Sequence, residues 1–169
     1  MYRAYVALGS NLGERAGHLR AATAAMNALP GTRVTAASSI YASAAMGADE
    51  PQPDYYNAVV GLDTELAPRR LLDALQRIEH DAGRTRIAGV RNTARTLDLD
   101  ILLFDDLVIA EHGLHVPHPR LQDRAFVVLP LAEIAPECVV PGVGPVFALV
   151  PRVAGQHIAR IADSTIAAG

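Results

Sequence analysis

The sequence predicts an α+β fold in which helices pack on an antiparallel β-sheet. Two observations support this class. Several short segments alternate apolar and polar residues with a period of two, as half-buried strands do. Two longer segments repeat apolar residues at helical spacing and separate the strands in the order strand, helix, strand, strand, helix, strand. That order is typical of the ferredoxin-like sandwich.

The first half of the chain supplies four of these elements. Residues 2–9 predict a strand, and residues 10–31 contain a helix that ends at a Pro-Gly pair. Alternating segments at 32–43 and 55–66 predict two further strands. The segment between them contains proline, glycine and acidic residues, so we expect a loop there.

The second half continues the pattern. Residues 68–82 predict a helix, because a proline opens the segment and a glycine follows it. An arginine-rich loop is expected at 84–95, followed by an apolar strand within 94–106. Residues 107–123 are expected to connect this strand to an apolar helix at 124–136. No element is predicted for the last thirty residues.

Length and composition predict an ordinary globular protein. The chain has 169 residues, 50% hydrophobic and 20% charged, so we expect one domain spanning 1–169. No apolar run is long enough for a membrane span, and the first residues do not form a secretory signal. The single cysteine, Cys138, agrees with a reducing compartment. We therefore expect a cytoplasmic protein, and we expect it to be a monomer.

The basic residues indicate a small polyanionic ligand. All fifteen are arginine, so lysine-dependent Schiff-base chemistry and the Walker A loop are excluded. The formal net charge of −3 argues against general nucleic-acid binding. Between Asp81 and Asp98, however, there is no acidic residue and there are four arginines, namely Arg84, Arg86, Arg91 and Arg95.

Two carboxylates interrupt the strand expected within 94–106. Asp98 and Asp100 share one face of it, and the opposite face is expected to carry Leu97, Leu99, Ile101 and Leu103. Unpaired acids on a covered face are costly, so a cation is expected in front of them. Mg²⁺ binds one or two protein carboxylates together with substrate phosphate. The alternative is a solvated face or pairing with arginines, but the arginine-rich loop before the strand favours a metal site.

A second group of residues is suited to a flat heterocycle. Tyr55 and Asn57 share one face of their strand, where a ring can stack on a planar ligand and an amide can read its donors and acceptors. A tyrosine at the start of a strand is also common without any ligand.

Two further segments are candidate anion sites. His118, Arg120 and Arg124 could hold phosphate, although a helix start with solvated arginines would show the same pattern. The glycine-containing stretch 9–13 lies between the first strand and the first helix, where backbone N–H groups favour anions. A simple helix cap in this stretch is an equal alternative.

Six short stretches identify a family when they are taken together. They are "ALGSNLG", "SSIYASAAMG", "QPDYYNAVV", "QRIEHDAGRTR", "RTLDLDILLF" and "VPHPRLQDRAFVVLPLAEIAP". Over nearly its whole length the chain therefore resembles the 6-hydroxymethyl-7,8-dihydropterin pyrophosphokinases of folate biosynthesis. The resemblance implies a ferredoxin-like fold with added strands and helices.

The resemblance also implies a reaction. A pyrophosphate would pass from ATP to the hydroxymethyl oxygen of the pterin, releasing AMP. Asp98 and Asp100 would hold two Mg²⁺ ions that bridge the triphosphate, and both would be catalytic together with Arg84 and Arg95. Phosphate contacts would come from Arg84, Arg86, Arg95, Arg124 and His118.

The pterin pocket follows from the same resemblance. Tyr55 and Phe126 would sandwich the pterin, and Asn57 would read its amide edge. Backbone contacts would come from Ser43, Ala44 and Met46, and Gln76 and Glu79 would lie near the nucleotide. This chain lacks the Trp-Gly-Pro that many members carry before the Arg-Thr-Leu-Asp run, so a tryptophan contact that helps to close the site is missing.

Two functions of other classes remain as alternatives. A non-catalytic sensor of a nucleotide or pterin would need the ring pocket, but it would have little need for two metal-bridging acids. An RNA-binding sandwich would carry paired aromatic residues on its central strands, where this chain has acids. The small-molecule enzyme is therefore the preferred interpretation.

Overall fold

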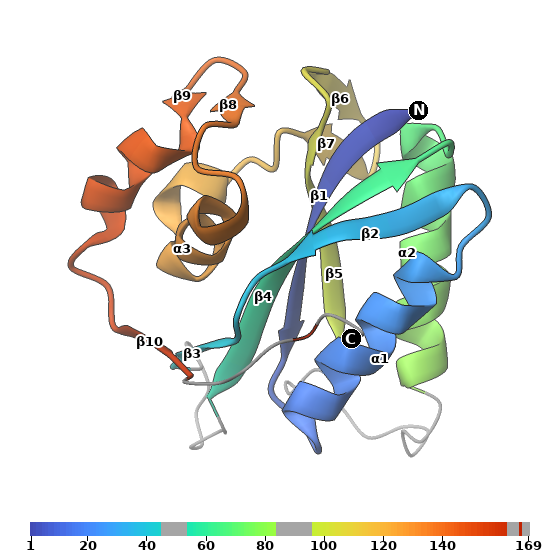
Figure 1. Ribbon diagram of the computed structural model, residues 1–169, viewed down its shortest axis with the longest axis horizontal. Coiled ribbons are helices and arrows are strands. Elements are labelled where there is room, and N and C mark those ends of the chain that lie inside the picture. The colour runs from blue at the N-terminus through green and yellow to red at the C-terminus, as the bar shows by residue number, and fades with distance from the viewer. Residues whose placement is uncertain (45–53, 84–95, 162–165, 167–169) are drawn as a thin grey trace.

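A six-stranded antiparallel sheet forms the centre of the protein. The computed structural model describes residues 1–44, 54–83, 96–161 and 166. The strands are β1 (Tyr2–Ser10), β2 (Thr32–Ala37), β3 (Tyr41–Ser43), β4 (Tyr55–Thr64), β5 (Asp98–Phe104) and β10 (Ile158–Arg160). They follow the order β10-β3-β4-β1-β5, and β2 also pairs with β4 (Figure 1). β1 thus lies between β4 and β5.

Helices cover both faces of this sheet (Figure 1). They are α1 (Arg15–Asn27), α2 (Pro68–Ala82), α3 (Ala125–Ile134) and the 3₁₀ helix η2 (Val146–Val153). Leu19 of α1 and Leu75 of α2 belong to the hydrophobic core on one face. Val128 of α3 and Leu149 of η2 belong to a second core on the opposite face. Because both faces are covered, β1 and β4 are buried along most of their length.

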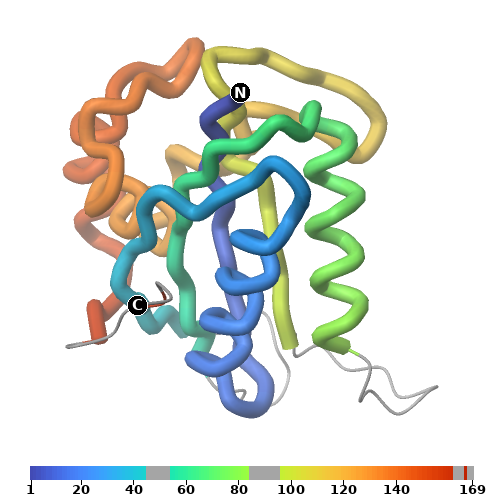
Figure 2. The backbone as a smooth tube through the Cα atoms, turned by 45° about the vertical axis from the view of Figure 1, so that its right-hand side comes forward, coloured from blue at the N-terminus to red at the C-terminus, as the bar shows by residue number. Residues whose placement is uncertain are grey.

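Smaller elements occupy the segments without predicted structure. They are β6 (Ile109–Glu111), β7 (Leu114–Val116), the 3₁₀ turn η1 (Leu121–Asp123), β8 (Val139–Val140) and β9 (Gly144–Pro145). β6 and β7 form a hairpin within residues 107–123, which were predicted to be connecting structure. Gly113 in its turn has φ +75°, a conformation that glycine adopts without strain. The hairpin lies beside the start of α2, where Arg69 Nη2 donates to His112 O at 3.0 Å (Figure 2).

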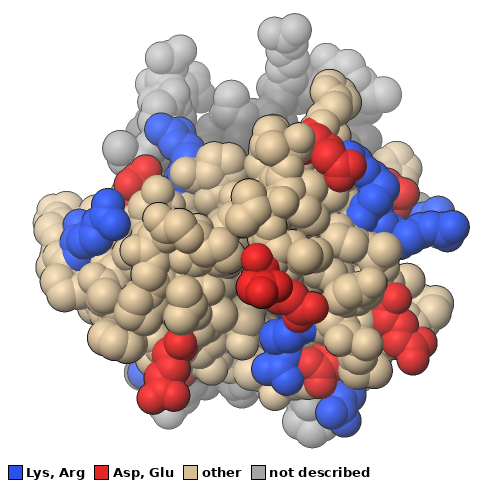
Figure 3. All heavy atoms as spheres, turned by 90° about the horizontal axis from the view of Figure 1, so that it is seen from above, with Lys and Arg blue, Asp and Glu red and all other residues tan. Residues whose placement is uncertain are grey.

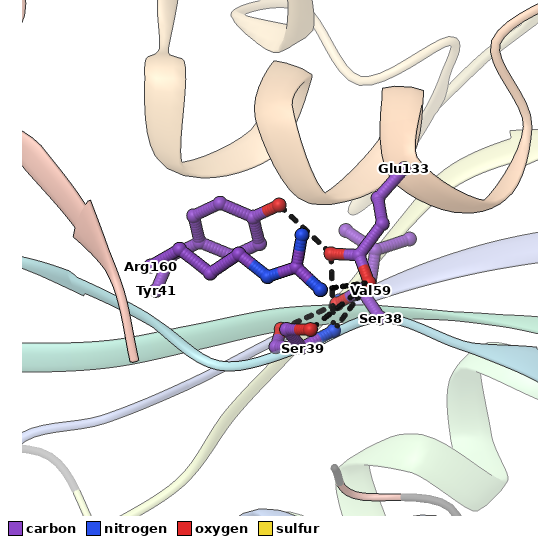
Figure 4. A network of polar contacts seen from close by, with 6 residues as sticks. All are labelled: Ser38, Ser39, Tyr41, Val59, Glu133 and Arg160. Carbon is purple, nitrogen blue, oxygen red and sulfur yellow. Dashed lines mark hydrogen bonds and ion pairs between the residues drawn. The ribbon is translucent and has the colours of Figure 1, made fainter. Parts of the chain in front are cut away.

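The strand predicted at 32–43 is divided into β2 and β3, because a side chain of α3 bonds to the backbone between them. At the break, the Ser39 N–H donates to the Glu133 carboxylate of α3 at 3.1 and 3.0 Å (Figure 4). Ser38 remains joined to β4, since its N–H donates to Val59 O and its Oγ accepts from Val59 N, both at 2.9 Å. The amide of Ser39 therefore bonds to a helix side chain where a regular strand would continue.

One face assignment on β5 was wrong. Leu97, Leu99 and Ile101 lie in the core under α1 and α2, as predicted, but Leu103 lies in the opposite core. The pairing of β1 with β5 shifts register at this point, because Tyr5 faces Leu103 and the next residue of β1 faces Ile101. Such a bulge adds one residue to a strand and reverses the alternation beyond it.

Arginine and acidic side chains alternate on the end of the molecule that carries β6, β8 and β9 (Figure 3). Among the described residues on this face, there is no continuous basic surface of the kind that follows a nucleic-acid backbone. The helices in the described ranges are also too short or too polar to cross a membrane.

Candidate functional site

A cavity of about 430 Å³ opens on the sheet face that α3 covers. Strands β1, β3, β4 and β5 contribute to it, together with the segment leading into α3. Nine residues predicted from the sequence line it, namely Ser43, Ala44, Tyr55, Asn57, Asp98, Asp100, His118, Arg124 and Phe126. The structure therefore brings the two acids, the ring-binding candidates and the phosphate-binding candidates together in one place.

Small residues of β1 form the floor of this cavity. Gly9 pairs with Asn57 on one side and with Asp98 on the other, so these three residues lie side by side across the sheet. Two residues earlier on β1, Ala7 pairs with Asp100 in the same way. Two strand spacings separate Asn57 from Asp98, which is about 10 Å. A bicyclic heterocycle with a one-carbon arm spans a comparable length over the floor.

The amide of Asn57 is held in one orientation. Its Nδ2 donates to Ser43 Oγ at 2.8 Å, and the carbonyl oxygens of Tyr41 and Tyr55 lie at 3.3 and 3.4 Å. The residue is 5% exposed. Because the nitrogen faces these three oxygens, Oδ1 faces the floor beside Gly9, where a Cβ would lie 3.5 Å from it. Asn57 can therefore accept a hydrogen bond from a ligand N–H group.

Asp98 and Asp100 place two carboxylates on one face of β5. Asp98 is half-buried and Asp100 is exposed, and both line the cavity. In the described part of the chain no cluster of three or more metal-ligating side chains occurs. A closed structural metal centre is therefore not formed by these residues alone. Two hard oxygen donors do fit Mg²⁺, since that ion keeps several positions for water and substrate phosphate.

His118 lines the cavity, and its surroundings favour the neutral imidazole. Burial lowers the pKa of His118, and the charges of Arg124 and Arg120 lower it further, against the opposing effect of Asp100. Its Nδ1 accepts the Arg120 N–H at 3.2 Å. We infer from this bond that the proton of the neutral ring is on Nε2, where it can be donated to a phosphate oxygen.

Arg124 and Phe126 stand on either side of Ala125 at the start of α3. The Arg124 guanidinium carbon lies 5.4 Å from the centre of the Phe126 ring, within the range of a cation–π contact. Both side chains line the cavity opposite the sheet. A planar ligand between Tyr55 and Phe126 would thus lie next to a fixed positive charge.

Gln76 and Glu79, which were predicted to lie near the nucleotide, are not among the described residues that line this cavity. Glu79 Oε2 accepts the Leu99 N–H at 2.8 Å, so it binds the outer edge of β5. The remaining predicted residues, Met46, Arg84, Arg86 and Arg95, lie outside the described residues.

Five lining residues were not among the predicted site residues, namely Ala7, Leu8, Gly9, Leu102 and Val127. Gly9 belongs to the stretch 9–13, which was predicted as a candidate anion site. Leu102 lies two residues after Asp100, so alternation places it on the same face of β5 as the two acids. The others carry no reactive group. Their part in the floor and wall follows from strand pairing and helix packing, which no local pattern reveals.

Comparison with known proteins identifies the family of this chain. The model of the 7,8-dihydro-6-hydroxymethylpterin-pyrophosphokinase family matches residues 5–136. The chain belongs to this family. The resemblance drawn from the six stretches is confirmed, and so is the predicted ferredoxin-like α+β fold.

Two relatives in this pyrophosphokinase family carry the same curated name, 2-amino-4-hydroxy-6-hydroxymethyldihydropteridine pyrophosphokinase. The protein from Haemophilus influenzae is 43% identical over 161 residues, covering 95% of this chain and 99% of that protein. The protein from Pseudomonas aeruginosa is 50% identical over 139 residues, covering 82% of this chain and 84% of its own length.

Solved structures agree with the fold of the pyrophosphokinase family. Wild-type Plasmodium falciparum HPPK-DHPS with pteroate superposes with a TM-score of 0.68 at 14% identity. The match covers 89% of this chain and 44% of that one, so this chain spans less than half of the Plasmodium protein. At this identity the likeness concerns the fold alone.

Proposed function

We propose that this chain transfers pyrophosphate from ATP to the hydroxymethyl oxygen of 6-hydroxymethyl-7,8-dihydropterin, with release of AMP, as a step of folate biosynthesis. Membership of the pyrophosphokinase family supports this reaction and the use of ATP as co-substrate. The observation that carries the proposal to the residue level is the row Asn57, Gly9, Asp98 across the cavity floor. In this row, Asn57 would read the ring of the substrate and Asp98 would hold a metal ion near the end of its hydroxymethyl arm.

The pterin would lie between Tyr55 and Phe126. Stacking on two aromatic rings suits a flat bicycle and contributes binding free energy beyond the buried area. Asn57 would accept a hydrogen bond from the amide edge of the pterin, and Ser43, which holds the Asn57 amide, would form the neighbouring wall with Ala44. The hydroxymethyl arm would then point along the floor toward Asp98.

Asp98 and Asp100 would hold two Mg²⁺ ions in contact with the triphosphate. When bound, such ions neutralise phosphate oxygens and align an in-line displacement. The His118 Nε2–H and the Arg124 guanidinium face the same space and would stabilise the negative charge of the transferred group. None of the described side chains stands out as a general base, so positioning and charge neutralisation would carry most of the rate enhancement.

The sensor remains the second candidate. A pocket that binds pterin or ATP without turnover would need Asn57 and the aromatic pair, but it would gain little from two carboxylates beside the phosphate-binding side chains. The placement of both acids in the same cavity as His118 and Arg124 favours the enzyme.

Other properties stay predictions from the sequence. They are the single domain spanning 1–169, the monomeric state, the cytoplasmic location and the lack of a nucleic-acid partner. The net charge of −3 supports the last of these.

The proposal is tested by measuring AMP release from Mg-ATP with and without 6-hydroxymethyl-7,8-dihydropterin. We expect AMP to form only when the pterin is present, and chelation of Mg²⁺ to abolish it. Pterin binding in calorimetry without any AMP would contradict the enzyme and support the sensor.

Gly9 provides a prediction about the floor. A Cβ at Gly9 would meet Asn57 Oδ1 at 3.5 Å and Tyr55 Cδ1 at 3.7 Å, which are ordinary contacts. Gly9→Ala should therefore fold normally and lower kcat/KM for the pterin by less than about tenfold. Gly9→Val adds two further methyl groups where the ligand would lie, and we expect a loss of about a hundredfold, equivalent to about 2.7 kcal/mol.

The Gly9 measurement is a titration of pterin at saturating ATP, together with thermal unfolding of both variants. Normal pterin kinetics in Gly9→Val would show that the ligand does not lie over β1.

A further inference from the structure

The helix that carries part of the candidate site begins without a cap of its own. α3 starts at Ala125, and its N-cap residue, Arg124, has extended backbone angles of φ −120° and ψ 116°. Helix starts are usually capped by a side-chain oxygen that accepts an exposed N–H group of the first turn. Arginine has no acceptor, and the side chain of Arg124 makes no capping bond. Its guanidinium lines the cavity instead.

Gln156 supplies the missing acceptor from a distant part of the chain. The Ala125 N–H donates to Gln156 Oε1 at 2.8 Å, and Gln156 Nε2 donates to Asp123 O at 2.7 Å. One side-chain amide thus binds an N–H and a carbonyl two residues apart, as a neighbouring strand would. We call this pair of bonds the Gln156 clasp.

The Gln156 clasp bonds the backbone on both sides of Arg124, whose side chain lines the cavity. Asp123 and Ala125 flank Arg124 directly, and Phe126 follows next. The backbone is thus bonded on both sides of Arg124, whose guanidinium carbon lies 5.4 Å from the centre of the Phe126 ring. Ala125 itself is 1% exposed, so its N–H has little access to water as a substitute partner.

The segment that contains Gln156 also pairs with the strand that forms the opposite wall of the cavity. Two residues after Gln156, the strand β10 begins and pairs with β3, with Ile158 opposite Ser43. Ser43 lines the cavity and accepts the bond from Asn57. Figure 1 shows β10 beside β3, below α3. Residues 156–160 therefore connect the wall that carries Phe126 to the wall that carries Ser43. They lie after residues 5–136, which the family model matches.

We propose that Gln156 is a positioning residue for the pterin pocket. It acts through Asp123 and Ala125, so that Arg124 and Phe126 face the ligand, and it does not line the cavity itself. This inference rests on the proposed function, because it concerns the pterin that Phe126 would stack on.

The experiment compares four variants with the wild type. Gln156→Ala removes both bonds, and Gln156→Asn shortens the side chain by one methylene. Gln156→Glu keeps an oxygen for the Ala125 N–H but has no N–H for Asp123 O. His157→Ala is the matched control, since it truncates an exposed side chain next to Gln156. Hydrogen exchange of the Ala125 amide by NMR, melting temperature, and KM and kcat for each substrate are measured.

For Gln156→Ala we expect the Ala125 amide to exchange at least about tenfold faster and KM for the pterin to rise about tenfold, because both bonds of the clasp are lost and each contributes only modestly. KM for ATP should stay within about threefold, because other phosphate contacts do not depend on the clasp. Gln156→Glu keeps only the bond to Ala125, so we expect the protection of the Ala125 amide to recover and KM for the pterin to lie between those of the wild type and Gln156→Ala. His157→Ala should match the wild type.

The proposal is overturned if Gln156→Ala leaves KM for the pterin unchanged, or if it lowers only the melting temperature, which would indicate a purely structural role. It is also overturned if Gln156→Glu protects the Ala125 amide and yet binds pterin as weakly as Gln156→Ala. If Gln156→Ala does not fold, Gln156→Asn takes its place with the same expectations. A wild-type protein that releases no AMP would refute the proposed function, whereas the exchange of the Ala125 amide would still test the clasp.

Discussion

Replacing Asp98 or Asp100 by asparagine should lower kcat for pyrophosphate transfer by about a thousandfold or more, because each change would remove a negative charge from the proposed Mg²⁺ and triphosphate site. The fold should persist, since Asp98 is half-buried and Asp100 is exposed on the cavity side of β5. Asparagine also preserves the size of the side chain. AMP formation is followed at increasing Mg²⁺ concentrations, with circular dichroism to verify folding.

Asp106→Asn is the matched control for this pair. Asp106 is an exposed aspartate just after β5, and it does not line the cavity. We expect its kcat and its Mg²⁺ dependence to equal those of the wild type. A kcat within tenfold of the wild type in either Asp98→Asn or Asp100→Asn would refute the assignment of these acids as metal ligands.

Replacing Glu133 by alanine should destabilise the fold by about 2–3 kcal/mol, through the donors left without an acceptor. The Glu133 carboxylate accepts Ser39 N–H, Ser39 Oγ–H at 3.0 Å and Tyr41 Oη–H at 2.8 Å, and Arg160 lies 3.7 Å away (Figure 4). Ser39 and Tyr41 are both at most 7% exposed. Burial and the bond to Glu133 raise the pKa of Tyr41, so the phenol remains a neutral donor throughout the physiological range.

The stability of Glu133→Ala is measured by urea unfolding at 25 °C, beside Glu137→Ala. Glu137 is an exposed residue just past the end of α3, so its truncation should change the unfolding free energy by less than about 0.5 kcal/mol. A double-mutant cycle with Tyr41→Phe isolates the bond between Tyr41 and Glu133. Equal stabilities of Glu133→Ala and Glu137→Ala would show that this network does not hold α3 to the sheet.

The alternation along β5 predicted the faces of some residues correctly and of one residue wrongly. Alternation alone placed Asp98 and Asp100 on one face, and the structure puts both in the cavity. The same alternation misplaced Leu103, because a bulge against β1 leaves Leu102 and Leu103 on the same face and reverses the faces after Leu102. A bulge depends on how two strands pair, and the sequence of one strand does not reveal that pairing.

The break between β2 and β3 has a similar origin. Residues 32–43 alternate throughout, so one strand was predicted. The Ser39 N–H instead bonds to Glu133, which lies 94 residues further along the chain. The sequence around Ser39 does not indicate a partner so far along the chain, so the break could not be predicted from residues 32–43 alone.

The sequence by itself determined the α+β class, most strands and helices, and the residue types that form the site, because those depend on short-range periodicity and on the chemistry of single side chains. Tertiary structure decided which of them meet. It placed Gly9 between Asn57 and Asp98, brought His118 near Asp100, and used Gln156 to complete a helix start that Arg124 leaves uncapped. Each of these contacts joins segments far apart in the chain, so strand register and helix packing had to be known first.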